Sequence, residues 1–161
     1  MIYRLKQFLR AITAKMNQQE YRFVQQYLSP EEATLFMQLK IDEQKHSLCV
    51  AKLMSELSVT RQEEYIKLGL LHDIGKIKYP LNPIEKGMMV VLDRITRGKV
   101  KGINGLKIVK GYYQHALEGY QLLSELGNYE MDFLEAVKWH HTPMKTTSEL
   151  LYALIQCDYK A

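Results

Sequence analysis

A chain of 161 residues with 47% hydrophobic and 25% charged residues has the composition of one globular domain with a substantial core. Scattered glycines, four prolines and the lack of a low-complexity tract exclude a disordered linker. The net charge of +4 suits an anionic ligand without requiring one. We expect residues 1–40 to form N-terminal helices that pack on a core built from residues 41–161.

The cellular compartment is predicted from what the sequence lacks. No apolar run approaches the roughly 18 residues that span a bilayer, and the first residues lack the apolar block of a signal peptide. Cys49 and Cys157 have no CxxC spacing, which favours two buried free thiols in a reducing environment. These features predict a cytoplasmic protein without a transmembrane segment.

Hydrophobic periodicity and capping signals predict helices almost throughout the chain. The predicted helices cover residues 2–16, 17–28, 29–40, 42–57, 60–73, 82–97, 112–126, a segment from 128 or 132 to 141, and a last helix that starts at 146. Their starts are marked by the pairs Asn17 and Glu20, Ser29 and Glu32, Thr60 and Glu63, Asn82 and Glu85, and Thr146 and Glu149. No run has a convincing strand alternation, so the predicted fold class is all-α, a compact helical bundle.

Two basic segments have more than one interpretation. The amphipathic pattern over 2–16 carries four basic residues and no acid, which suits either packing on its own domain or peripheral contact with a membrane or partner. The segment 98–111 alternates glycines with lysines and predicts a mobile loop, either solvated or a lid that attracts phosphate. Tyr112 and Tyr113 follow it and could stack on a base or simply pack.

The pair His72-Asp73 ends an apolar run over 66–71. Imidazole and carboxylate are both good ligands for a divalent metal, although a helix C-cap with a satisfied histidine is the simpler alternative. Gly75 is expected to close the helix in a left-handed conformation. Lys76 then places a cation where it could hold a phosphoryl oxygen.

The order of the histidines along the chain is more informative than any one of them. The order is His46, then His72-Asp73, then His115, then His140-His141, then Asp158. Asp42 lies one helical turn before His46 and could be a further ligand, although an exposed acid at a helix start is the ordinary explanation.

This order resembles the HD superfamily of metal-dependent phosphohydrolases over roughly residues 40–160. The most specific piece is the motif His-Asp-Ile-Gly-Lys at 72–76, and the motif His-Ala-Leu-Glu-Gly-Tyr at 115–120 looks like the third-histidine helix of the HD-GYP branch. That branch has a glycine-rich segment ending in Gly-Tyr-Pro where this chain has residues 142–147, a departure that argues against specificity for cyclic di-guanylate. The compact layout resembles small stand-alone bacterial HD proteins, including dinucleoside tetraphosphate hydrolases.

The resemblance implies a set of metal ligands. One metal would be held by His46, His72, Asp73 and Asp158. Asp73 would bridge to a second metal, held by His115 and by His140 or His141 or both. Histidine-rich ligands favour a divalent transition metal, with iron or manganese preferred and zinc, nickel, cobalt or magnesium as alternatives. Two such ions generate a hydroxide that attacks phosphorus, and Lys76 would neutralise the developing charge.

The predicted function is therefore hydrolysis of a phosphoester or phosphoanhydride in a small phosphorylated substrate, with a nucleotide preferred. A metal-binding or nucleotide-binding sensor that has lost catalysis is one alternative, and the complete ligand set argues against it. A di-iron oxygenase is another alternative. Lys76 argues against it, because a cation beside the site suits a phosphorylated substrate. Long nucleic acid is not expected as a partner, because the positive charge is modest and concentrated in one short segment.

Overall fold

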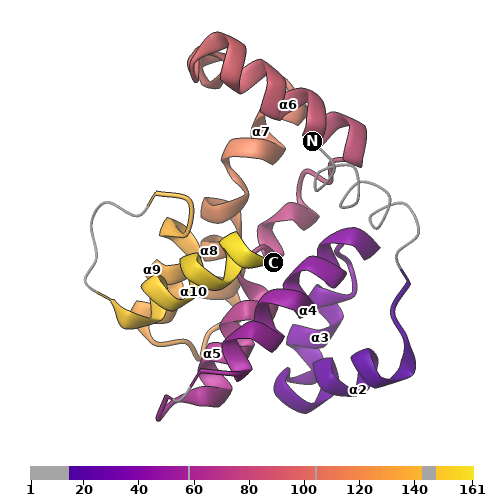
Figure 1. Ribbon diagram of the computed structural model, residues 1–161, viewed down its shortest axis with the longest axis vertical. Helices are drawn as coiled ribbons and strands as arrows, with labels where there is room; N and C mark the ends of the chain where they lie inside the picture. The colour runs from indigo at the N-terminus through magenta and orange to yellow at the C-terminus, as the bar shows by residue number, and fades with distance from the viewer. Residues whose placement is uncertain (1–14, 58, 104, 143–147) are drawn as a thin grey trace.

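The computed structural model describes residues 15–57, 59–103, 105–142 and 148–161 (Figure 1). Every regular element in these ranges is helical, which confirms the all-α fold class. The elements are α2 (Gln18–Tyr27), α3 (Pro30–Phe36), α4 (Ile41–Ser55), α5 (Gln62–Leu71), η1 (Ile74–Ile77), α6 (Pro83–Thr96), η2 (Lys99–Gly102), α7 (Lys107–Tyr113), α8 (His115–Leu126), α9 (Met131–Trp139) and α10 (Glu149–Lys160). Most of the predicted helix over 2–16 lies outside the described residues, and its last two positions are not helical.

Local capping chemistry sets several of the helix starts. The predicted capping boxes are confirmed at α2, α3 and α6, where the cap side chain and the carboxylate three residues later satisfy each other's backbone N–H groups. The prediction at Thr60 is wrong, because α5 begins after Arg61. The last helix is capped by Ser148, whose hydroxyl accepts a hydrogen bond from the N–H of Leu151, whereas the predicted cap Thr146 lies outside the described residues.

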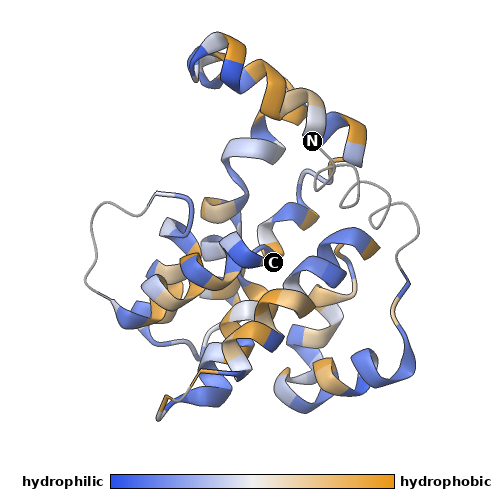
Figure 2. Cartoon of the chain, viewed as in Figure 1, coloured by the Kyte–Doolittle hydropathy of each residue, from blue (hydrophilic) through white to orange (hydrophobic). Residues whose placement is uncertain are grey.

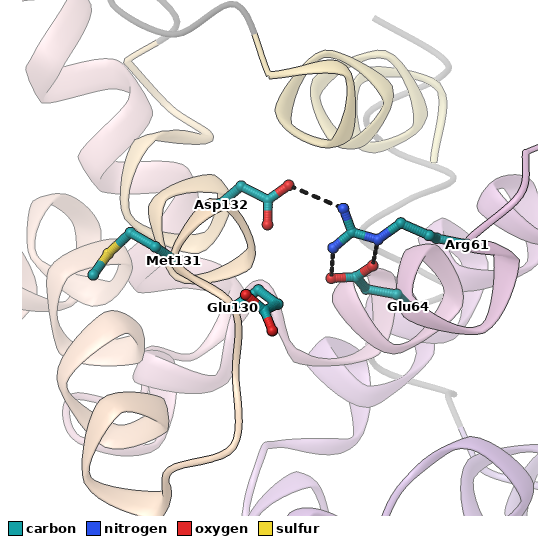
Figure 3. Close-up of a pocket in the computed structure, with 5 residues that line it drawn as sticks. All are labelled: Arg61, Glu64, Glu130, Met131 and Asp132. Atoms are coloured by element: carbon teal, nitrogen blue, oxygen red, sulfur yellow. Dashed lines mark hydrogen bonds and ion pairs between the residues drawn. The ribbon is translucent and has the colours of Figure 1, made fainter.

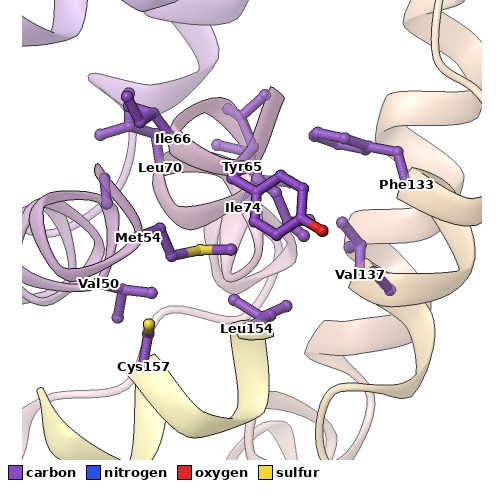
Figure 4. Close-up of a cluster of buried hydrophobic side chains, with 14 of the residues drawn as sticks. Val50, Met54, Tyr65, Ile66, Leu70, Ile74, Phe133, Val137, Leu154 and Cys157 are labelled. Carbon is purple, nitrogen blue, oxygen red and sulfur yellow. The ribbon is translucent and has the colours of Figure 1, made fainter. Parts of the chain in front are cut away.

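One large core joins most of the helices. Helices α4 and α5 pack along each other, α10 lies against both, and α9 packs on α5, α8 and α10. Their shared interior contains Met54, Leu70, Phe133 and Leu154, each almost fully removed from solvent (Figure 4). Figure 2 shows hydrophobic and hydrophilic residues alternating along the ribbons of these helices. Burial of such side chains is the main term that stabilises the bundle.

The N-terminal helices contribute to the same core. Val24 and Leu28 come from α2 and its C-cap, and Phe36 and Leu39 come from the end of α3 and the turn after it, and all four are buried in the core cluster. Among the described residues, no helix is both long enough and apolar enough to cross a membrane.

A close approach between two elements explains Gly75, and the expected left-handed helix end is wrong. Gly75 lies inside η1 with no positive φ. A Cβ atom there would stand 2.0 Å from the carbonyl oxygen of His115 and 2.3 Å from the amide nitrogen of Gly119. Glycine is therefore required because η1 packs directly on the backbone of α8, and this contact brings Asp73 next to His115.

The segment 98–111 is not one loop, so this prediction is corrected as well. It contains η2 and the start of α7, and Val100 and Val109 bury their side chains with Met89 of α6 in a small second core. The many glycines and lysines of this segment suggested a loop, although its few apolar residues make buried contacts. We call α6, η2 and α7 together (residues 83–113) the α6–α7 arm, which projects from the rest of the molecule at the top of Figure 1.

The two cysteines differ in environment. Cys157 is buried in the main core, as expected, whereas Cys49 is exposed on α4, so that half of the prediction is wrong. Position 49 is on the solvent side of α4, because its neighbours Leu48 and Val50 take the buried positions.

Candidate metal centre

Five parts of the fold converge on one place. His46 comes from the middle of α4, His72 and Asp73 from the turn between α5 and η1, and His115 from the first position of α8. His140 caps the end of α9, His141 follows it, and Asp158 lies in the last turns of α10.

The structure brings all seven predicted ligand residues into two adjacent groups. His46, His72 and Asp158 form one group, and Asp73, His115, His140 and His141 form the other. Within each group the potential ligand atoms lie within 4.8 Å of one another. This is the spacing expected of side chains that surround a common centre, such as a metal ion.

Asp73 lies between the two groups and presents one carboxylate oxygen to each. Its Oδ1 is 3.4 Å from Nε2 of His115 and 3.5 Å from Nε2 of His140. Its Oδ2 is 3.4 Å from Nε2 of His72 and 3.8 Å from Nε2 of His46. A carboxylate with this arrangement can bridge two cations.

Backbone carbonyls fix the orientation of three of the imidazole rings. Nδ1 of His72 lies 2.9 Å from the carbonyl oxygen of Gly69, Nδ1 of His115 lies 3.1 Å from that of Gly111, and Nδ1 of His140 lies 2.6 Å from that of Val137. Because a carbonyl only accepts hydrogen bonds, each Nδ1 must carry the proton. Each Nε2 is then left with its lone pair facing the centre, the tautomer required of a metal ligand.

Three buried polar atoms at this point have no hydrogen-bond partner. They are Nε2 of His72, Oδ1 of Asp73 and Nε2 of His140. Buried polar atoms are almost always paired, because an unpaired one costs about 1–3 kcal/mol. All three are electron-pair donors directed at the same region, so the residues fit a cation placed among them.

The electrostatics of the centre keep the carboxylates charged. Burial alone would raise the pKa of Asp73, but the charge of Lys76 and the ring of His72 outweigh it and hold that pKa well below its usual range. Asp158 behaves alike: its burial is outweighed by a hydrogen bond of 2.9 Å from His46, which lowers its pKa. Both carboxylates are therefore available as anionic ligands at neutral pH.

Two histidines of the second group, His115 and His141, are kept neutral. Burial is the main reason that the pKa of His115 falls to about 4. Burial and the neighbouring rings of His140 and His115 lower the pKa of His141 to about 3. The Nε2 atoms of His115 and His141 face each other at 2.8 Å. Since Nδ1 of His115 carries its proton, the proton between these two nitrogens belongs to His141, and a metal ion would replace it.

A chain of ion pairs runs from the centre to the α6–α7 arm. Nζ of Lys76 contacts Oδ2 of Asp73 at 2.5 Å and Oε2 of Glu43 at 2.9 Å. Lys86 of α6 contacts the other oxygen of Glu43 and reaches Oδ2 of Asp42 at 2.5 Å. The interpretation of Asp42 as an exposed acid at a helix start is therefore wrong. Its carboxylate is mostly buried and forms an ion pair with Lys86.

Glu43 is the residue near this site that sequence reasoning missed. It is buried, and its carboxylate lies between two ammonium groups. The available signal was its position three residues before His46, which places both on one face of α4.

A separate hollow lies between the starts of α5 and α9 (Figure 3). Arg61 bridges Glu64 and Asp132 across it, and Glu130 and Met131 complete its lining. None of these residues belongs to the metal centre. The polar lining of the hollow is accounted for by the exposed ion pairs of Arg61. We therefore assign the hollow no binding or catalytic role.

A protein-family model described as the HD domain matches residues 44–160. The chain belongs to the HD domain family. The match covers the candidate histidine and aspartate ligands of both groups and begins one residue after Glu43. No curated protein and no solved structure matched the chain.

Membership in the HD domain family indicates a metal-dependent, hydrolase-like function, because HD domains bind divalent metals. The buried His/Asp groups could hold such a metal. The candidate ligands of this chain come from elements far apart in sequence, and the packing of η1 on α8 and of α9 on α10 brings them together.

Proposed function

We propose that this HD domain hydrolyses a phosphoester or phosphoanhydride bond, and that its substrate is a small phosphorylated molecule of the nucleotide class. The observation that supports this most is Asp73, which presents one oxygen to each of two ligand groups. Two-metal sites of this kind are typical of enzymes that displace an oxygen at phosphorus.

The ligands divide between two ions. His46, His72, Asp158 and Oδ2 of Asp73 would hold one ion, and His115, His140, His141 and Oδ1 of Asp73 would hold the other. Five imidazoles and two carboxylates favour iron or manganese, with zinc, nickel, cobalt or magnesium as alternatives. When bound, the ions would lower the pKa of a water molecule and stabilise charge on the phosphoryl oxygens.

Lys76, beside the proposed ion sites, supplies a fixed positive charge. Burial would lower the pKa of Lys76, but Asp73 and Glu43 raise it above its usual range, so Nζ stays protonated. Its ammonium is placed beside the carboxylate that would bridge the ions, where negative charge develops during hydrolysis. We assign Lys76 to the stabilisation of that charge.

The nucleotide class is supported by the charge of the α6–α7 arm rather than by aromatic stacking. Tyr112 and Tyr113 pack against the small core of the arm, and the hydroxyl of Tyr113 donates to Asp93. Packing within the arm therefore accounts for both tyrosines, and the proposal does not need them to stack on a base. Basic residues of the arm attract a polyanion, and Lys86 fixes the start of α6 beside the centre.

Metal content and hydrolysis test the proposal together. The chain is purified with and without oxygen, its metals are measured by elemental analysis, and bis(p-nitrophenyl) phosphate and a nucleotide panel are offered as substrates. We expect metal-dependent hydrolysis, and Asp73→Ala should lose both metal and activity. Retention of both by Asp73→Ala would contradict the site. A fully metal-loaded chain that hydrolyses none of these substrates would contradict the function and favour the sensor alternative.

A further inference from the structure

The α6–α7 arm has an apolar surface that no other part of the described chain covers. Ile84, Met88, Val91 and Ile95 are spaced by four, three and four residues, so they lie on one face of α6. Ile84 is 71% exposed and Ile95 is 73% exposed. A continuous stripe of this kind marks a binding surface, whereas single exposed apolar residues are ordinary.

The stripe faces away from the body of the molecule. Lys86 contacts Asp42 and Glu43 of α4, and at 100° per residue it points to nearly the opposite side of α6 from the stripe. Met89 points to a third side, into the small core with Val100 and Val109. The helix is thus held by two of its sides, and the apolar stripe is the side left open to solvent.

Exposed apolar residues continue into the segment after α6. Ile103 is 51% exposed and Leu106 is 52% exposed. The arm therefore supplies six of the twelve exposed large hydrophobic side chains among the described residues. This concentration distinguishes it from the rest of the surface.

The net positive charge of the chain is concentrated in the arm. Residues 83–113 contain seven basic and two acidic residues, an excess of five positive charges, while the whole chain has a net charge of +4. Both acids are engaged, Glu85 in the capping box of α6 and Asp93 with the hydroxyl of Tyr113.

The basic side chains that remain lie beside the apolar stripe. Arg94, Arg97, Lys99 and Lys107 are exposed, and within the part of the chain that the structure describes none of them forms an ion pair. Arg94 is separated from the stripe by about a quarter of a turn of the helix. The surface is thus apolar along its middle and cationic at its margin.

We propose that this face of the α6–α7 arm binds the surface of an anionic lipid bilayer. Apolar residues of an interfacial helix enter the boundary between headgroups and acyl chains, and basic residues beside them contact anionic headgroups. The arrangement of Ile84, Ile95 and Arg94 on α6 meets both requirements. The proposal rests on the apolar stripe and the charge beside it, so it holds whether or not the chain is a phosphohydrolase.

Two other partners suit the surface less well. A second copy of the chain would bring two faces with the same excess of positive charge together, which costs free energy at an interface. A nucleic acid would use the charge but would leave Ile84 and Ile95 without an apolar partner. An anionic bilayer satisfies the charge and the apolar stripe at once.

The test is co-sedimentation of the full chain with large unilamellar vesicles. One set contains phosphatidylcholine alone, and the other contains phosphatidylcholine and phosphatidylglycerol in a ratio of about 3:1. We expect binding to the anionic vesicles, at least about tenfold weaker binding to the neutral ones, and a strong decrease in 0.5 M salt, since salt screens surface charges. A failure to bind the anionic vesicles would overturn the proposal.

Paired variants assign the binding to the arm. The double variant Ile84→Ser with Ile95→Ser removes the two most exposed apolar residues of the stripe. The double variant Arg94→Gln with Lys99→Gln removes two positive charges. Each should weaken vesicle binding by about tenfold or more. Tyr152→Ser with Tyr159→Ser is the matched control, because these exposed side chains lie on α10, and it should bind as the original chain does.

Two results from these variants would overturn the proposal. Undiminished vesicle binding by both arm variants would place the binding elsewhere, such as in the basic segment 2–16. A dimer of the original chain in light scattering that becomes monomeric with Ile84→Ser and Ile95→Ser would show that a second copy covers the stripe. Circular dichroism verifies that each variant keeps its helical content.

Discussion

Nζ of Lys76 lies 2.5 Å from Oδ2 of Asp73, the oxygen that faces His46 and His72. The ammonium thus stands close to where a cation held by those imidazoles would contact the same oxygen. Glu43 holds Nζ from its other side at 2.9 Å. A metal ion in the proposed site would compete with Lys76 for the Asp73 carboxylate, and Glu43 would keep the lysine nearby.

This relationship predicts that Lys76→Met destabilises the metal-free protein more than the metal-loaded one. Without metal, removal of the ammonium takes its lysine partner from the buried Asp73 and leaves Glu43 with Lys86. We therefore expect the free energy of unfolding to fall by about 3 kcal/mol. Added Mn²⁺ or Fe²⁺ should restore most of that loss. Urea denaturation with and without metal measures both values.

The same variant should keep its metal and hydrolyse model phosphoesters about 100-fold more slowly, because one stabilising charge is lost. Lys78→Met is the matched control, since Lys78 is the next lysine in the chain but is exposed and pairs with Glu118. Such a surface pair contributes at most about 1 kcal/mol. An equal loss of stability with and without metal in Lys76→Met would contradict the competition between lysine and metal.

Gly75→Ala is predicted to separate η1 from α8. The added Cβ would lie 2.0 Å from a backbone oxygen of α8, which no side-chain movement relieves. We expect a loss of about 3 kcal/mol or more in the free energy of unfolding, together with weaker metal binding, because Asp73 and His115 move apart. Thermal unfolding and metal titration measure the two effects.

Gly87→Ala provides the control for that substitution. Gly87 lies within α6, and a Cβ there would have no neighbour within 4 Å. Alanine favours helix over glycine, so this variant should gain up to about 1 kcal/mol of stability. Equal stability changes at the two glycines would contradict the assignment of Gly75 to a close approach.

Glu20 lies outside the metal centre, and its environment leads to a prediction about how the stability of the protein depends on pH. Burial would raise its pKa, but the hydrogen bonds from Lys45 and from the N–H of Asn17 outweigh it, so the pKa of Glu20 lies below its usual 4.5. A carboxyl with a lowered pKa in the folded state stabilises the protein above its unfolded pKa. That stability is lost as pH falls through the folded pKa.

Glu20→Gln should therefore cost about 1–3 kcal/mol at pH 7 and progressively less below pH 4.5. Urea denaturation of both chains between pH 7 and pH 3 measures the difference. Glu63→Gln is the control, because Glu63 is exposed in the first turn of α5. A difference at Glu20 that stays constant down to pH 3 would contradict the linkage.

Much of the helical pattern and the grouping of the site followed from the sequence, because the signals there are local or chemical. A capping box such as Asn17 and Glu20 needs only four consecutive residues. The order of His46, His72 and Asp158 along the chain resembles the HD superfamily, and that resemblance implied a shared site before any distance was known.

The features that escaped prediction depend on contacts between distant elements. Glu43 meets Lys86 only because α6 folds back on α4 across 43 positions. The sequence around Gly75 does not show whether glycine serves a left-handed turn or a close approach, since both exclude a Cβ. The helical start of α7 was hidden because the apolar partner of Val109 is Met89, on a different helix.

The two-group arrangement makes a prediction about metal stoichiometry. Asp158 belongs with His46 and His72, whereas His141 belongs with Asp73, His115 and His140. Asp158→Asn should weaken one ion by about 100-fold or more and leave the other in place, and His141→Ala should do the reverse. Asp73→Asn should weaken both, because its two oxygens face both groups.

Metal per chain after dialysis against a weak chelator measures these outcomes. We expect about two ions in the original chain, about one in Asp158→Asn and in His141→Ala, and fewer than one in Asp73→Asn. Asp132→Asn, an exposed carboxylate on α9, is the control and should keep two. About one ion in the original chain, lost from Asp158→Asn and from His141→Ala alike, would contradict this prediction and mean that the two groups hold one shared ion.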